Sequence, residues 1–237
     1  MSQTSKPAGG DGGGTVLQRF MKSQWALLSF RSSPIAPVDR GNFLAFALGI
    51  TWLAGIGRYW DHPSAQWWQY AGSGSVAYVF VLAGLLWLVG LPLRIFGWKY
   101  SGVLLFVCMT SPPALLYAIP VERFLPLYVA QDVNFWFLAV VAAWRVGLLL
   151  RFLAVPCGLG AGALVVTLLP LCVIVLALSA FNLEQATFEI MATGETQETP
   201  HDGAYAAVVM MSIASIFAVV PLVACYAWIA VNRRRSK

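Results

Sequence analysis

Long runs of apolar residues, separated by short polar stretches, fill the sequence from about residue 42 onward. Each run is continuous and lacks the period-two alternation of a strand in an outer-membrane barrel. A helix needs about 20 mostly apolar residues to cross a bilayer, and it satisfies its own backbone groups in lipid. The pattern therefore predicts an all-α membrane protein, a six-transmembrane-helix bundle with spans at about 42–60, 75–95, 101–120, 133–151, 157–181 and 204–231.

The pattern changes before the first run. Residues 1–14 are Gly-rich and polar, so we expect a disordered tail there. Residues 15–32 predict an amphipathic helix that lies at the membrane interface, and partner binding is the alternative role for it. The chain then divides into this cytoplasmic segment, 15–40, a transmembrane domain, 41–231, and a basic tail, 232–237. The apolar residues that share one face of the expected helix are Val16, Leu17, Phe20, Met21, Leu27 and Leu28, with Arg19 and Lys22 off that face.

Charge predicts the orientation of the spans. Of the 15 basic residues, 13 lie in the N-terminal region, in the connections near 95–100 and 151–156, in the C-terminal tail, or at the adjoining helix ends. Only Arg58 and Arg123 lie in the other connections, where most of the acidic residues are found. Because basic loops stay in the cytoplasm, this distribution predicts that both termini are cytoplasmic. We expect a multi-pass protein of a bacterial inner (plasma) membrane.

Composition agrees with a lipid environment. Only 11% of the residues are charged, whereas soluble domains carry about 25%. The net charge is +5, but the basic residues flank the apolar runs and form no patch, so nucleic acid is not an expected partner. We expect membrane lipids and a protein partner or a second copy of the chain as partners, and no cofactor. No disulfide or zinc site is predicted, because no CxxC occurs and the cysteines lie in or beside apolar runs, at Cys108, Cys157, Cys172 and Cys225.

A pair of prolines, Pro112 and Pro113, falls in the middle of the third run. Each proline removes a backbone hydrogen bond and bends a helix, and Thr110 or Ser111 could satisfy the groups that are freed. The break is either a packing kink or part of a site, because broken helices line binding sites in transporters.

Arg145 interrupts the fourth run. It lies roughly 20 Å along a span that begins near Asp132, within the inner third of a layer about 30 Å thick. From there its side chain either snorkels to the cytoplasmic headgroups beside Trp144 or turns inward toward Pro112 and Pro113. Arg151 should lie at the surface. No acid in the central part of any span could pair with either arginine, so the pair is foremost an orientation signal.

Histidines and carboxylates gather on the predicted outer side. His62 and His201 could share a metal with Glu184 or Glu189. The simpler interpretation is that they are solvated loop residues, and we expect neither a catalytic nor a metal site. A membrane enzyme that acts on a lipid or envelope substrate is nevertheless one hypothesis, and it would use Asp61, His62, Glu122, Arg123, His201 and Asp202.

Small and aromatic residues have structural interpretations. Gly158 and Gly162 form a GxxxG pair, which lets membrane helices approach closely. Amphipathic rings favour the interface between water and lipid, so an aromatic belt is predicted for Tyr59, Trp60, Trp67, Trp68, Tyr70, Trp98 and Tyr100.

Residues 85–120 resemble the second and third spans of Yip-type (Ypt/Rab-interacting) membrane proteins. Phe96-Gly97-Trp98 corresponds to an FGG-like turn, and Pro112-Pro113 with Tyr117 corresponds to a proline near an aromatic residue. Residues 135–170 are similar to the fourth and fifth spans, through Trp144, the arginines, Gly158, Gly160 and Pro170. The resemblance implies a small helical bundle with a cytoplasmic N-terminus, and in eukaryotic members a role in membrane traffic with small GTPases.

Three functions fit these observations. The first is a non-enzymatic multi-pass membrane protein that organises protein partners or lipids. The second is a small oligomeric transporter or channel, which the proline-broken spans suggest. The third is the membrane enzyme described above. The first is favoured, because the spans carry no catalytic constellation.

Overall fold

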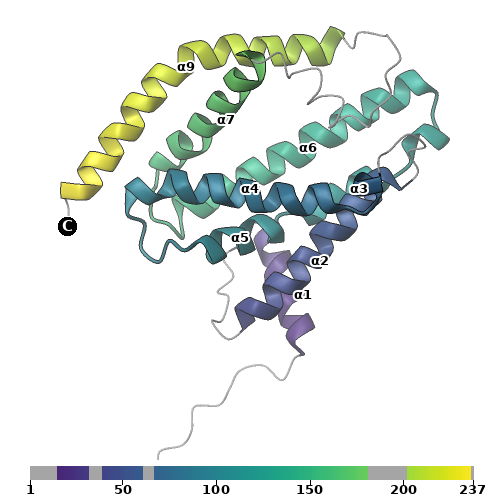
Figure 1. Cartoon of the computed structure of the whole chain (residues 1–237), viewed down its shortest axis with the longest axis horizontal. Coiled ribbons are helices and arrows are strands. Elements are labelled where there is room, and N and C mark those ends of the chain that lie inside the picture. The colour runs from purple at the N-terminus through teal and green to yellow at the C-terminus, as the bar shows by residue number, and fades with distance from the viewer. Residues whose placement is uncertain (1–14, 32–38, 61–66, 181–201, 236–237) are drawn as a thin grey trace, which may run out of the picture.

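The computed structural model describes residues 15–31, 39–60, 67–180 and 202–235, and this part of the chain is predominantly helical, without a strand (Figure 1). The predicted all-α fold is confirmed for it. The α-helices are α1 (Val16–Leu28), α2 (Arg40–Tyr59), α3 (Trp67–Tyr70), α4 (Ser73–Gly90), α5 (Tyr100–Met109), α6 (Leu127–Ala154), α7 (Gly162–Ala180) and α9 (Asp202–Arg235). Three 3-10 helices connect them, η2 (Leu91–Leu93), η3 (Pro112–Ala118) and η4 (Val121–Arg123).

Three helical stretches in the described residues are long and apolar enough to cross a membrane: Ser73–Leu93, Asp132–Ala154 and Met210–Arg235. They are made of α4 with η2, of α6, and of α9. Two shorter apolar stretches, Tyr100–Leu116 and Gly162–Ala177, fall below that length. The structure therefore identifies a protein with membrane-spanning helices by length and composition.

The helices form two groups. We call α1 to α6 the body, and the antiparallel pair α7 and α9 the hairpin, which lies beside the body in Figure 1. The core of the body centres on α5, where residues 103–109 are all buried. A second, smaller core joins the hairpin to the end of α6 and to the turn after α4, through Leu93, Ile95, Leu153, Leu159, Ala163, Val166 and Ala230.

Trp98 links the two cores. Its ring packs against both of them, and its indole N–H donates to the carbonyl of Trp87, 2.9 Å away. Trp98 therefore does not belong to the aromatic belt that the sequence predicts. Its ring lies directly over Gly90, the last residue of α4, so α4 and the following turn close tightly only because that position has no side chain.

Helix α1 packs on the body through part of its apolar face. A capping box between Thr15 and Gln18 defines its start, as each residue hydrogen-bonds the backbone N–H of the other. Phe20 is buried, and its ring lies 5.4 Å from the rings of Phe43 and Phe46. The expected apolar face is therefore only partly buried. Leu17, Met21 and Trp25 form an exposed row at the same helical spacing, next to the face that packs on the body.

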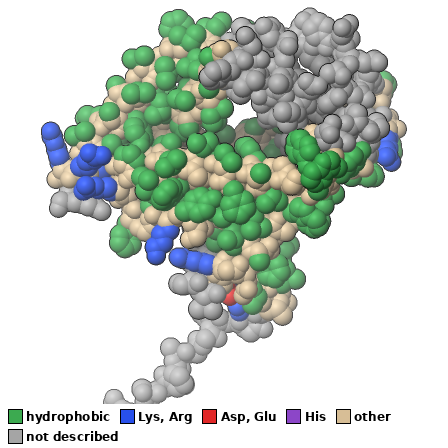
Figure 2. Space-filling view, in the orientation of Figure 1, with side chains coloured by type: hydrophobic (Ala, Val, Ile, Leu, Met, Phe, Trp, Pro, Cys, Tyr) green, Lys and Arg blue, Asp and Glu red, His purple; other side chains and the backbone are tan. Residues whose placement is uncertain are grey.

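Most of the molecular surface is apolar. Figure 2 shows hydrophobic side chains spread across the described part of the visible face, while Lys and Arg side chains occur in a few places along its margin. In the three long stretches only 28%, 17% and 11% of the residues are buried within the chain. A water-soluble fold buries its apolar helix faces, so these helices need lipid or another protein around them.

Candidate functional site

The third apolar run is not one continuous helix. Helix α5 ends at Met109, and the chain continues as the 3-10 helix η3 from Pro112. Pro112 and Pro113 have no backbone N–H, so the carbonyls of Cys108 and Met109 lose the partners that an α-helix would give them. The Ser111 N–H donates to the Cys108 carbonyl at 3.0 Å and so replaces the first of these bonds.

The second freed carbonyl is satisfied from another helix. The Gln24 side chain of α1 donates from Nε2 to the Met109 carbonyl, 3.3 Å away. Gln24 is only 4% exposed, so its amide would be costly to bury without this bond. Helix α1 is therefore fixed at the point where the third apolar run breaks.

Hydroxyl groups complete this polar site. The Thr110 hydroxyl donates to the Val107 carbonyl at 2.7 Å, and the Thr51 and Ser111 hydroxyls lie 2.9 Å apart. Thr51, Thr110 and Ser111 are all buried. The sequence predicts that Thr110 or Ser111 satisfies the groups freed by the prolines, but neither hydroxyl bonds a freed carbonyl: the Ser111 backbone N–H reaches Cys108, and Gln24 reaches Met109. We call Gln24, Thr51, Thr110 and Ser111, with the Met109 carbonyl, the break cluster.

Arg145 turns toward the inside of the body. Its guanidinium carbon lies 5.9 Å from the centre of the Tyr78 ring on α4, and it is within electrostatic reach of Cys108 on α5. Side chains lean toward the N-terminus of their helix, so Arg145 leans toward the Leu127 end of α6, away from Arg151. Within the described residues no hydrogen-bond partner reaches its buried Nη2 atom.

Helix α1 covers this region from one side. Beyond the Gln24 bond, the Trp144 indole N–H on α6 donates to the Leu28 carbonyl at 3.0 Å. At the other end of α1, Arg19 makes a two-pronged ion pair with Asp39, which precedes α2, with Nη2 and Oδ1 2.9 Å apart. Asp39 raises the pKa of Arg19 above its ordinary value through this hydrogen bond and its charge. Helix α1 thus connects α2, α5 and α6.

The predicted outer residues are only partly described. His62 and His201, with Asp61, Glu184 and Glu189, lie outside the described residues, and for Glu122 and Asp202 only the backbone is described, in η4 and at the start of α9. Arg123 stacks over the Trp60 ring at 4.9 Å, and Trp60 donates to the Ala118 carbonyl. In the part of the chain that is described, no three His, Cys, Asp or Glu side chains come together.

The two glycines of the GxxxG pair have different positions. Gly162 begins α7 and faces Ile229 of α9, so it lies where the two helices approach. Gly158 precedes α7, in the turn after α6, with a φ of +61°. Its position differs from the predicted helix packing, and the left-handed backbone explains the glycine there.

The break cluster has little reactive chemistry. Its members are hydroxyls, an amide and a carbonyl that mostly pair with one another, and Arg145 adds a fixed positive charge nearby. Sequence reasoning identified the prolines and Arg145 but missed Gln24 and Thr51. The signal for Gln24 is its spacing of four residues from Phe20, which places one polar residue on the face that packs.

A scan of protein-family models, a search of curated proteins and a search of solved structures each found no match to this chain. The similarity to Yip-type proteins therefore stays a prediction, carried by residues 85–120 and 135–170.

Proposed function

We propose that this chain is a non-enzymatic, multi-pass membrane protein that organises lipids and protein partners within the membrane. The observation that carries the proposal is the low burial of its apolar helices, which falls to 11% in the apolar stretch of α9. Large side chains such as Phe217, Val220 and Trp228 of that helix are more than half exposed. Lipid contacts such a surface, and a partner helix can replace that lipid.

The proposal includes six spans with both termini in the cytoplasm. Its support is that α2, α4, α5 with η3, α6, α7 and α9 follow the six apolar runs in order. Arg94, Arg151 and Arg233 flank the second core at one end of the molecule, while Arg123 and Trp60 meet at a separate site near η4. Basic residues at the cytoplasmic ends of spans fit the positive-inside rule. A bacterial inner membrane is the proposed location.

The test is purification of the full chain in a mild detergent, followed by mass spectrometry of the intact complexes. We expect a defined complex with bound lipid, with a second copy or with another membrane protein. Phe217→Ala and Trp228→Ala on α9 should weaken protein association, whereas Met211→Ala, an exposed residue nearer the start of the same helix, serves as the matched comparison. A monomer without bound lipid would contradict the proposal.

A transporter or channel is the second candidate, and the break cluster favours it. The Met109 carbonyl, which depends on Gln24 of α1 for its donor, lies in the third apolar run, and the buried Nη2 atom of Arg145 in the fourth run has no hydrogen-bond partner among the described residues. Broken helices and buried charges in membranes commonly mark a solute path. If this chain conducts a small anion, Arg145→Gln should abolish flux in proteoliposomes, while Arg123→Gln should leave it unchanged. Equal flux in protein-free vesicles and in vesicles with the wild-type chain would count against transport.

A further inference from the structure

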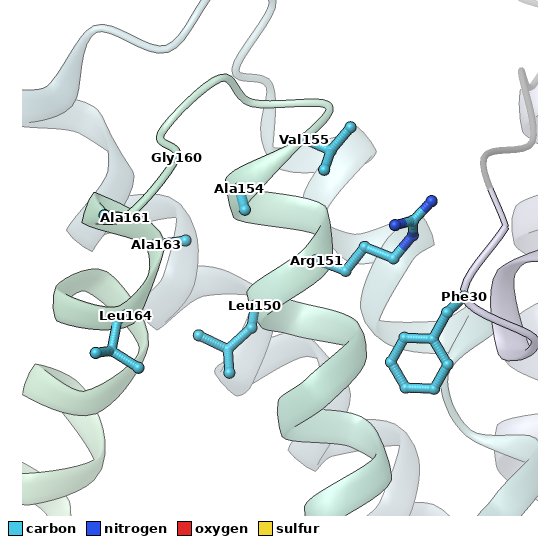
Figure 3. A pocket seen from close by; sticks show the side chains of 9 residues that line it. All are labelled: Phe30, Leu150, Arg151, Ala154, Val155, Gly160, Ala161, Ala163 and Leu164. Carbon is cyan, nitrogen blue, oxygen red and sulfur yellow. The ribbon is translucent and has the colours of Figure 1, made fainter.

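A shallow groove of about 390 Å³ lies over the end of α6 (Figure 3). The first turn of α7 forms one wall, and Phe30, which follows α1, stands at the other side. Every lining side chain is apolar except one. The residues that line the groove are Phe30, Leu150, Arg151, Ala154, Val155, Gly160, Ala161, Ala163 and Leu164.

Arg151 is the one charged residue of this groove. In Figure 3 its side chain extends toward Phe30, while Leu150 points the opposite way, toward Leu164. A basic residue in the last turn of a helix often complements the helix carbonyls. Here the carbonyls of Phe152, Leu153 and Ala154 already accept N–H groups from the following turn, at 3.1–3.2 Å. These bonds close the end of α6 with backbone groups of the following turn.

The surroundings of the groove are basic. Arg233, at the end of α9, donates to the carbonyl of Gly158 in the turn between α6 and α7. Arg94 follows Leu93, which packs with Leu153 in the same core. No acidic residue lines the groove. This end of the described structure therefore presents a positive potential next to an apolar depression.

We infer that this groove binds an anionic phospholipid, with the headgroup phosphate at Arg151 and an acyl chain along Leu150 and Leu164. An occupant must match both properties of the site. Free phosphate would pair with the guanidinium but leave the apolar walls in contact with water, and a neutral lipid would not use the charge. Basic pockets between membrane helices on the cytoplasmic side bind the headgroups of acidic lipids. The inference rests on the proposed function, because it names the lipid that the protein organises.

The experiment uses the full chain in nanodiscs of phosphatidylcholine, with or without phosphatidylglycerol. Intact-complex mass spectrometry counts the phosphatidylglycerol molecules that stay bound after transfer to detergent. We expect Arg151→Gln to weaken this retention about fivefold, the equivalent of about 1 kcal/mol for one arginine near a membrane surface. Arg123→Gln removes the same charge beside Trp60 and η4, away from the groove, and should retain phosphatidylglycerol as the wild type does.

Two further variants separate the site from general charge and from misfolding. Ala161 is exposed and precedes α7, so Ala161→Trp should fill the groove, keep Arg151 and still lower retention. Arg151→Lys keeps a positive charge and should retain more lipid than Arg151→Gln. Equal retention by the Arg151→Gln and Arg123→Gln variants would overturn the inference, and so would stabilisation by inorganic phosphate alone to the same extent. The proposed function itself fails only if the wild type holds neither lipid nor a partner.

Discussion

In the body, seven consecutive residues of α5 are buried, whereas in the hairpin only 11% of the residues in the most apolar window of α9 are buried. Both helices are apolar around their whole circumference. Helix α5 is surrounded by other helices of the body, because residues of α1, α2, α4 and α6 pack against it. Among the described residues, α9 packs along the side that faces α7 and the end of α4, where the Tyr226 hydroxyl donates to the Val89 carbonyl at 2.6 Å.

This difference separates two kinds of apolar helix. A helix that is hydrophobic all round is either buried in protein or surrounded by lipid. Stability in the body should therefore depend on side-chain packing within the chain, and residues of the hairpin should matter mainly for association. Matched substitutions in the two regions test that contrast.

The largest effect is expected at Phe20. Its ring is 1% exposed and packs edge-on against Phe43, so Phe20→Ala should lower the free energy of unfolding by about 3–5 kcal/mol. The matched change in the hairpin, Phe217→Ala, removes a ring that is 76% exposed and should cost less than about 0.5 kcal/mol. Titration of a denaturing detergent into mixed micelles measures both. Similar losses for the two variants would mean that α9 packs against more of the chain than the structure shows.

The next effect is expected where the two regions meet. A methyl group at Gly90 would clash with the Trp98 ring, which packs against both cores. Gly90→Ala should therefore destabilise the protein by about 1–3 kcal/mol. Gly84 lies in the same helix with open space at its Cβ position, so Gly84→Ala should be neutral or slightly stabilising. Thermal unfolding of both variants in one detergent tests this, and a harmless Gly90→Ala would show that the turn after α4 moves freely.

A third prediction concerns the break cluster. Gln24→Met keeps the length of the side chain but leaves the Met109 carbonyl without its donor, so the free energy of unfolding should fall by about 1–3 kcal/mol. Lys22→Met, at an exposed position of the same helix, should change it little. Pro113→Ala restores an N–H four residues after Met109, so Gln24→Met should cost less in that background. Strictly additive losses in this double-mutant cycle would contradict the assigned bond.

The positions of the helices could be predicted from sequence more fully than their contacts. The apolar run at 42–60 became α2 at Arg40–Tyr59, and the break in the third run follows from proline chemistry. The partner of the freed Met109 carbonyl could not be predicted, because Gln24 lies 85 residues away and only the fold brings them together. The sequence predicts Trp98 at the membrane interface, whereas its ring packs against both cores. Hydropathy does not distinguish a tryptophan ring in a core from one in a headgroup layer.

The smallest effect is expected at the ion pair between Arg19 and Asp39, which holds the start of α1 next to α2. The Arg19 side chain is 42% exposed, so solvent and salt weaken the attraction. Arg19→Lys keeps the charge but loses the two-pronged geometry, and should cost less than any of the body variants above. Because Asp39 raises the pKa of Arg19, the contribution of that arginine is fully present below the pKa it has in the unfolded chain, and it does not change between pH 6 and 9. Thermal unfolding in low and high salt at these two pH values measures both dependences. A difference between wild type and Arg19→Lys that persists in 1 M salt would instead assign the effect to packing of the arginine stem on α1.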